Sequence, residues 1–185
     1  MRILLGQLEK SLEGHLYYLS LITALAVPDI AGALDAEDGQ ATGERYRSWY
    51  ERWVRPRFGE TIKKLLAGEV APLNIPVETN PLDGDACYRF RCSLLHQGSS
   101  QHPKSQYSRI VFIEPGSALG SIHYCIMNDA LCIDLGQFCR EMISGARLWL
   151  DDVETSEPFR TNYDRFARRH ATGLPPFIAN VPVIG

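Results

Sequence analysis

The chain has 185 residues, of which 45% are hydrophobic and 22% charged, and its formal net charge is −3. This length suits one domain with a sizeable core, and the composition is ordinary for a soluble globular protein. The acidic balance makes the whole chain a poor general binder of nucleic acid. The five cysteines form no dense framework, which is typical of a reduced, cytoplasmic protein. No apolar run approaches the roughly 20 residues that span a bilayer, so no membrane contact is expected.

Apolar residues recur at three- and four-residue steps over 3–26, which predicts one long first helix. Pro28 and Asp29 are expected to end it. A polar, glycine-containing loop over 35–43 follows. Thr42 is a suitable N-cap for the next helix.

This second helix carries an aromatic stripe interleaved with arginines. The stripe consists of Tyr46, Trp49, Tyr50 and Trp53. Such an arrangement can stack bases and hold phosphates, although aromatic residues at helical spacing more often form a core. Residues 44–64 contain seven basic and three acidic residues, which predicts a basic patch on an acidic protein. An ordinary solvated helix face is the alternative.

Pro56 is expected to end or kink the second helix. A short helical segment over 57–66 should continue the bundle. Residues 68–81 contain three prolines and therefore predict an extended connector.

Residues 83–98 predict the helix around which the chain is organised. Acidic residues stand in its first turn, and Gly98 follows its last turn as a C-cap. Arg91 and His96 are five positions apart, which is roughly 140° around the helix. Tyr88 and Cys92 fall in the arc between them. A cation that keeps its charge therefore flanks a side chain of a type that titrates near neutrality.

Three short apolar runs after Gly98 predict a small antiparallel β-meander over about 108–133. Asp134 then caps a strong helix, with Gln137 in capping-box spacing. Ser156 begins a last helix. The proline-rich tail over about 173–185 should lie extended on the surface or on a partner.

The cysteines lack the C-x2-C pairs that structural zinc sites usually show, so buried free thiols are expected. Glycines follow one predicted strand, but no lysine follows them as in a phosphate-binding P-loop. No metal and no cofactor are therefore expected.

Arg91-x4-His96 on an amphipathic helix, followed by Gln97-Gly98, resembles the R-x4-6-H motif of the HEPN superfamily. The motif covers six residues, and the helical pattern supports it. The resemblance implies an up-down helical bundle forming a single domain over 1–185, elaborated by the β-meander after the motif helix. Many members are metal-independent ribonucleases of bacterial defence and toxin–antitoxin systems. Others are non-catalytic modules that bind a nucleotide or a protein.

For a ribonuclease, His96 would act as general base or acid on the 2′-hydroxyl and the leaving oxygen. Arg91 would bind the phosphate and stabilise its developing charge. The resemblance implies a homodimer that brings two motifs into one cleft. The side chains expected to contact the substrate there, or to support it, are Tyr88, Cys92, Asp85 and Arg89. RNA, and an antitoxin or another protein, are the expected partners.

Two other interpretations stay open. Active members often carry a polar residue directly after the arginine, whereas this chain has Cys92. That difference and the net acidity favour a non-catalytic module, while the basic segment 44–64 favours the nuclease. In a purely structural interpretation, Arg91 forms an ion pair with a neighbouring helix and His96 caps the end of its own helix.

Overall fold

The computed structural model describes residues 1–60, 80–117 and 122–185. The described residues form six helices and 52% of them are helical, so the prediction of a mostly α protein is confirmed. The helices are α1 (Arg2–Glu13), α2 (Tyr17–Leu34), α3 (Gly43–Trp53), α5 (Gly84–Gln97), α6 (Leu135–Val153) and α7 (Glu157–Tyr163). The strands are β1 (Arg109–Ile113), β2 (Cys125–Met127), β3 (Ala130–Asp134), β4 (Arg169–His170), β5 (Gly173–Leu174), β6 (Ile178–Ala179) and β7 (Val183–Ile184). The helical segment predicted over 57–66 and the connector over 68–81 lie largely outside the described residues.

The first helix is in fact two helices, α1 and α2, joined by a turn over 14–16. His15 has a positive φ of 56° in this turn. The backbone N–H of Leu16 donates to the carbonyl oxygen of Ser11 at 2.8 Å. The prediction of one helix over 3–26 is wrong because the apolar spacing continues through the turn and hides it.

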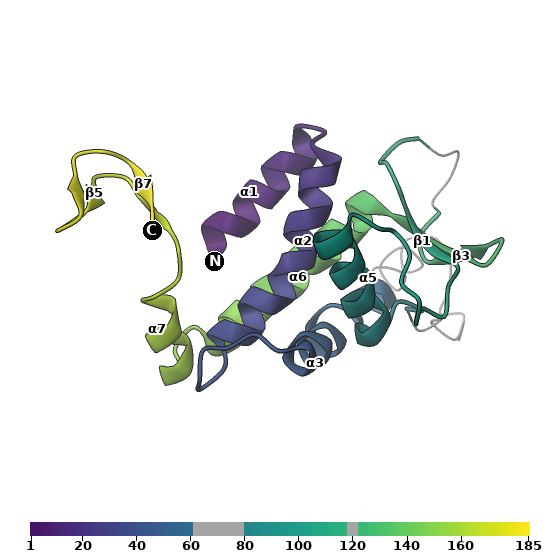
Figure 1. Cartoon of the computed structure of the whole chain (residues 1–185), viewed down its shortest axis with the longest axis horizontal. Helices are drawn as coiled ribbons and strands as arrows, with labels where there is room; N and C mark the ends of the chain where they lie inside the picture. Colours follow the sequence, from purple (N-terminus) through teal and green to yellow (C-terminus); the bar gives the residue numbers. More distant parts are fainter. Residues whose placement is uncertain (61–79, 118–121) are drawn as a thin grey trace, which may run out of the picture.

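Helix α2 lies at the centre of the molecule and contacts α1, α3, α5, α6 and α7 (Figure 1). It runs through Pro28 to Leu34, so the prediction that Pro28 and Asp29 end the helix is wrong. Proline removes one helical hydrogen bond, and packing on several sides of α2 keeps that turn helical.

By length and composition alone, α2 could cross a membrane, and it is the one such helix among the residues described. Half of it is buried within the fold, and core helices of soluble proteins pass the same test. The expectation that no apolar run approaches the length that spans a bilayer overlooked α2, which is an 18-residue helix.

Four helices begin at a capping side chain, and the sequence predicts three of these, at Thr42, Asp134 and Ser156. Side-chain oxygens of Thr42, Asp83, Asp134 and Ser156 accept backbone N–H groups at the starts of α3, α5, α6 and α7. Gly98 ends α5 in the left-handed conformation, with φ of 63°. Each cap satisfies backbone groups that have no partner inside the helix.

Helices α3 and α5 pack closely, and this contact positions the motif helix. The aromatic residues Tyr46, Trp49 and Tyr50 of α3 are buried, which confirms that the stripe belongs to the core. Gly84, the first residue of α5, lies directly against α3. A Cβ atom at Gly84 would lie 2.6 Å from the carbonyl oxygen of Arg47, so only glycine permits this approach.

The strands after α5 form a three-stranded sheet in the order β1-β3-β2. Strands β2 and β3 are antiparallel, and both residues of their turn, Asn128 and Asp129, have positive φ. Strand β1 is parallel to β3, so the antiparallel meander predicted over 108–133 is wrong in the direction of β1. The tight turn fixes only the β2–β3 pair. Tertiary packing decides what covers the other edge of β3, whose central residues are buried.

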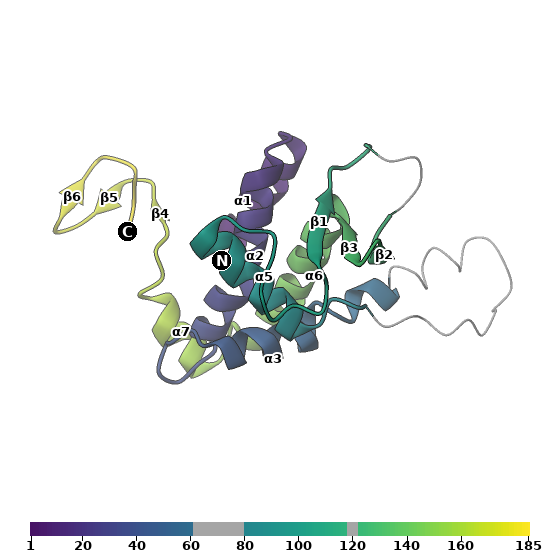
Figure 2. The same cartoon turned by 45° about the vertical axis from the view of Figure 1, so that its right-hand side comes forward.

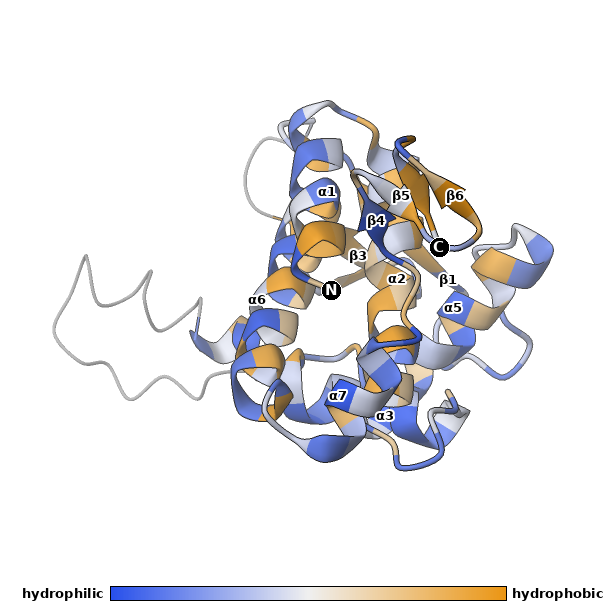
Figure 3. Cartoon of the chain, turned by 90° about the vertical axis from the view of Figure 1, so that its left-hand side faces the viewer, coloured by the Kyte–Doolittle hydropathy of each residue, from blue (hydrophilic) through white to orange (hydrophobic). Residues whose placement is uncertain are grey.

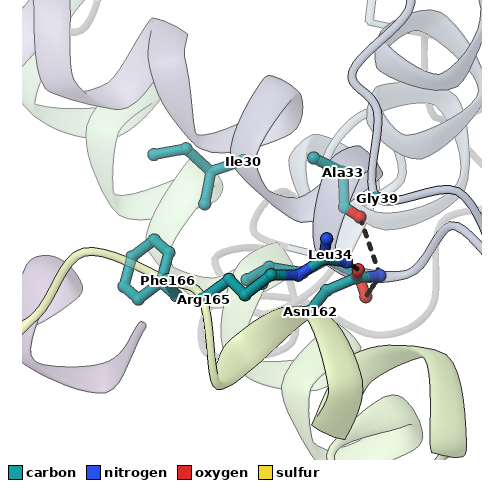
Figure 4. Close-up of a pocket in the computed structure, with 7 residues that line it drawn as sticks. All are labelled: Ile30, Ala33, Leu34, Gly39, Asn162, Arg165 and Phe166. Carbon is teal, nitrogen blue, oxygen red and sulfur yellow. Dashed lines mark hydrogen bonds between the residues drawn. The ribbon is translucent and has the colours of Figure 1, made fainter.

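Asn162 anchors α7 to the end of α2. The two N–H donors on its Nδ2 atom face the carbonyl oxygens of Ala33 and Leu34, at 3.3 and 3.2 Å (Figure 4), and that of Ala36, at 2.6 Å. Arg165 donates to Asn162 Oδ1 at 2.8 Å and holds that amide in place. The last carbonyls of a helix lack partners within it, so α7 supplies a C-terminal cap for α2.

The tail forms a β-hairpin, which we call the arm and define as residues 168–185. Strand β4 pairs with β7, and β5 pairs with β6, both antiparallel. Backbone hydrogen bonds of 3.0 and 3.1 Å join Arg168 and Gly185 at its base. The arm leaves α7 and points away from the helices (Figures 1 and 2).

Replacing Gly84 with alanine is expected to lower the free energy of unfolding by about 1–3 kcal/mol, the usual range for overpacking. The new methyl group would meet the Arg47 carbonyl oxygen, and α5 would have to move. Gly6→Ala in α1 is the matched control, since nothing lies within 4 Å of its Cβ position. It should stabilise by up to about 1 kcal/mol. Urea denaturation measures both, and equal stability of the variants would contradict the close α3–α5 contact.

Candidate functional site

Arg91 and His96 meet at the surface of α5. The Nη1 atom of Arg91 lies 3.1 Å from His96 Nε2. A guanidinium can only donate hydrogen bonds, so this contact requires an unprotonated Nε2 and places the ring proton on Nδ1. The long arginine side chain bridges the angle between the two positions on the helix. His96 is exposed, whereas Arg91 is partly buried.

Asp29 of α2 completes the arrangement. Its Oδ2 atom accepts hydrogen bonds of 2.7 Å from Arg91 Nε and lies 2.7 Å from Nη2. The two side chains are only 17% and 19% exposed. Asp29 is the only charged residue in α2. A lone carboxylate in an apolar helix is a signal that sequence reasoning could have used, but the assumed break at Pro28 concealed it.

Burial and charge shift the pKa values of this ion pair in opposite directions. Burial raises the pKa of Asp29, and the positive charge and the hydrogen bond of Arg91 oppose that rise. Burial also lowers the pKa of Arg91, but Asp29 and Cys92 outweigh it and the net shift is upward. The guanidinium therefore stays charged, and the short contacts hold the carboxylate as its counter-ion.

Tyr88 and Cys92 lie beside Arg91. The Cys92 sulfur is 3.9 Å from Arg91 Nη1, and its contact with the Tyr88 hydroxyl raises the pKa of Tyr88. The guanidinium of Arg47 lies 4.3 Å above the Tyr88 ring. Tyr88, Arg91, Cys92 and His96 are thus neighbours, and the side chain of Tyr88 is held from the opposite side by α3.

Asp85 and Arg89 pair with each other rather than with the motif residues. Arg89 Nη2 and Asp85 Oδ2 are 2.6 Å apart, and Arg47 Nε donates to Asp85 Oδ1 at 2.9 Å. Arg89 also contacts the carbonyl oxygen of Lys104. These contacts place Asp85 and Arg89 between α3, α5 and the following loop, where they position α5.

The other arginines of the basic segment are also paired. The ion pairs are Arg45–Asp38 at 2.6 Å, Arg52–Asp152 at 3.4 Å and Arg55–Glu51 at 2.9 Å. Each neighbouring carboxylate offsets the positive charge of its arginine, although exposed ion pairs of this kind are weak. The segment is therefore less positive toward a ligand than its sequence suggests.

A second polar cluster lies inside the fold, and no sequence pattern pointed to it. Glu141 of α6 accepts a hydrogen bond of 2.7 Å from the Tyr124 hydroxyl and lies 3.2 Å from His123 Nε2. All three residues are buried. Burial raises the pKa of Tyr124 well above its ordinary value. The cluster joins the segment before β2 to α6.

Within 1–60, 80–117 and 122–185, no three His, Cys, Asp or Glu side chains gather closely enough to hold a metal ion. The five cysteines are free thiols, and Cys87, Cys132 and Cys139 are buried. Burial raises the pKa of both Cys87 and Cys139 to about 12. These two thiols are therefore unreactive packing groups in the folded protein.

No protein-family model, curated protein or solved structure matches the chain. The likeness to the HEPN superfamily therefore rests on the Arg91–His96 motif and on a mostly helical fold.

Replacing Arg91 with glutamine should lower the free energy of unfolding by about 1–3 kcal/mol, because a mostly buried Asp29 loses its charged partner. Adding Asp29→Asn should recover part of the loss. Denaturation of the wild type, the two single variants and the double variant gives the coupling energy between Arg91 and Asp29. Arg147→Gln, which removes the exposed Arg147–Glu9 pair, is the control and should cost under about 1 kcal/mol.

The loss of unfolding free energy in the Arg91→Gln variant, relative to the wild type, should shrink at low pH. Burial already raises the folded-state pKa of Asp29, and removing the guanidinium raises it further. A group with a raised folded-state pKa favours the folded state below that pKa and loses this effect as pH rises through it. Measuring the free energy of unfolding of both proteins from acid to neutral pH tests this prediction. A stability loss that grows on acidification would contradict it.

Proposed function

We propose that the chain is a HEPN-like, metal-independent endoribonuclease that acts as a homodimer in a bacterial defence or toxin–antitoxin system. The observation that carries the proposal is the contact between Arg91 and His96 on α5, anchored by Asp29. It puts a fixed positive charge beside an imidazole with an available lone pair. That combination suits phosphodiester cleavage by proton transfer and charge stabilisation.

The hydrogen bonds of Arg91 suggest how RNA would engage the pair. Asp29 occupies donors on Nε and Nη2, while Nη1 faces His96 and Cys92. A phosphate oxygen that takes the Nη1 donor would replace His96 there. The His96 lone pair would then be free to accept the 2′-hydroxyl proton, so substrate binding would itself prepare the base.

Asp29 would act as a positioning residue in this scheme. It holds the guanidinium from the protein side, which reduces the rotamer freedom that Arg91 would lose on binding a phosphate. Tyr88 and Cys92 would border the phosphate position. Asp85 and Arg89 would support this surface through their contacts with Arg47 and the loop after α5.

The homodimer is supported by an apolar face of α2. Tyr18, Ile22 and Asp29 share one face at four- and seven-residue steps. Tyr18 is 61% exposed, and the adjacent Leu19 is 55% exposed. A helix that is apolar all round normally has partners on all sides. A second copy covering this face would lie beside the Asp29–Arg91 pair and bring two motifs together.

A non-catalytic module that binds a nucleotide or a protein, such as an antitoxin, is the alternative. One observation favours it. Arg91 already has a close ionic partner in Asp29, as the structural interpretation of the motif expects. Cys92, beside the guanidinium, takes the place where a polar residue is common in active members.

His96→Ala should abolish most RNA cleavage, because a positioned histidine typically contributes about 10²–10⁴-fold to a rate. Arg91→Lys should also lose most activity, since lysine keeps the charge but lacks the planar fork that reaches Asp29 and a phosphate together. EDTA should have no effect. The exposed His15 provides the control variant His15→Ala, which should cleave like the wild type. Gel assays of RNA cleavage by the purified proteins measure these rates. Equal rates for wild type and His96→Ala would point to a contaminating nuclease, and absence of any cleavage would favour the binding module.

Light scattering at micromolar concentration should show a dimer of the 20.8 kDa chain, with α5 and the exposed face of α2 in its interface. Tyr18→Glu should weaken this dimer by placing a charge in an apolar contact. Ile126→Glu, at a residue 62% exposed on β2, is the matched control and should leave assembly unchanged. A monomer across the concentration range would remove the composite cleft from the proposal.

A further inference from the structure

The arm carries large apolar side chains that its own copy does not cover. Phe177 at the tip is 84% exposed and Ile184 is 78% exposed. Ile178 and Val181 are 43% and 48% exposed. Figure 3 shows β5 and β6 as apolar strands on the side of the molecule that faces the viewer. Aromatic side chains in such positions are typical anchors of protein interfaces.

The root of the arm is held firmly, and this sets its direction. The rings of Tyr163 and Phe166 stack at 5.5 Å with an angle of 14° between them. The guanidinium of Arg168 lies 5.5 Å over the Tyr163 ring. Phe177 is 84% exposed, so the tip of the arm packs against no part of this root within one copy.

A pocket of about 470 Å³ opens beside this root. We call it the root pocket, and its apolar lining comes from Met1, Ile3, Leu150, Phe159 and Tyr163. Its volume falls within the usual range for apolar binding sites. It lies between the start of α1, the end of α6 and α7.

The charges of the two surfaces are complementary. The arm contains two arginines, Arg168 and Arg169, and no acidic residue. Residues 151–164, which form the end of α6 and α7, contain five carboxylates and one arginine. Arg2 at the pocket rim is shared between Asp151 and Glu154, at 3.1 and 2.8 Å, which leaves that group of three negative. An acidic rim suits a basic, apolar-tipped arm.

We propose that two copies of the chain exchange arms, so that Phe177 of each copy enters the root pocket of the other. The arm and the root pocket adjoin the same root. A two-fold axis beside that root would therefore form both arm–pocket contacts at once and leave no further copy to be added. The arginines of each arm then face the carboxylates of the other copy. This contact between arm and root pocket is separate from the α5–α2 interface of the proposed function, and it would stand even if the chain cleaved no RNA.

Dissociation constants of the full-length chain and three variants test the exchange. Phe177→Asp removes the anchor, and Ile3→Glu places a charge at a pocket residue that is 59% exposed. Each is expected to raise the dimer dissociation constant at least tenfold. Ile126→Asp, an exposed apolar residue on β2, is the control and should change it less than twofold. Circular dichroism confirms that each variant folds.

Mixing the two impaired variants gives a sharper result. The Ile3→Glu copy has an intact arm and the Phe177→Asp copy an intact pocket, so only the mixed dimer contains a working contact. Native mass spectrometry should show more heterodimer than the statistical half. A monomeric wild type, variants that dimerise like the wild type, or a statistical mixture would each overturn the exchange. A monomeric wild type would indicate that another protein covers the arm.

Discussion

The ion pair between Asp29 and Arg91 is the interaction on which the candidate site depends. An unpaired carboxylate on the apolar, central helix α2 would be strongly unfavourable, and the guanidinium that neutralises it comes from α5. The pair therefore fixes how α5 sits along α2. It also directs the rest of the Arg91 side chain toward His96, so the same contact that satisfies the core creates the polar surface of the motif.

This double role bears on the choice between a structural and a catalytic motif. A buried partner for Arg91 is what a structural ion pair requires, yet it is also what a preorganised phosphate ligand requires. His96 separates the two interpretations more clearly. It does not cap its own helix, because Gly98 and backbone groups close that end. Its contact is with Arg91, at the surface, where a substrate could reach both.

Two apolar surfaces in the described part of the chain have no partner within one copy. One is the face of α2 that runs from Tyr18 toward Asp29, and the other is the arm. Helix α2 packs against five neighbours and still exposes large apolar residues. Figure 3 shows the arm on the side of the molecule that faces the viewer. Assembly is the simplest physical explanation for both, since burial of apolar area drives association.

The sequence by itself determined the local structure. Capping residues at Thr42, Asp134 and Ser156, the C-cap at Gly98 and apolar spacing located four helices, because these signals act over a few residues. It also indicated Arg91 and His96 as neighbours on one helix. Spacing could not reveal the turn over 14–16, which leaves the apolar period intact.

Only the tertiary structure determined which segments pack against each helix and strand. It kept α2 helical through Pro28, set β1 parallel to β3, and brought Asp29 to Arg91 from 62 positions away. It also paired arginines of the basic segment with carboxylates, which a count of charges could not foresee. These outcomes depend on packing between segments distant in sequence, whereas periodicity and capping report only on the residues within a few turns.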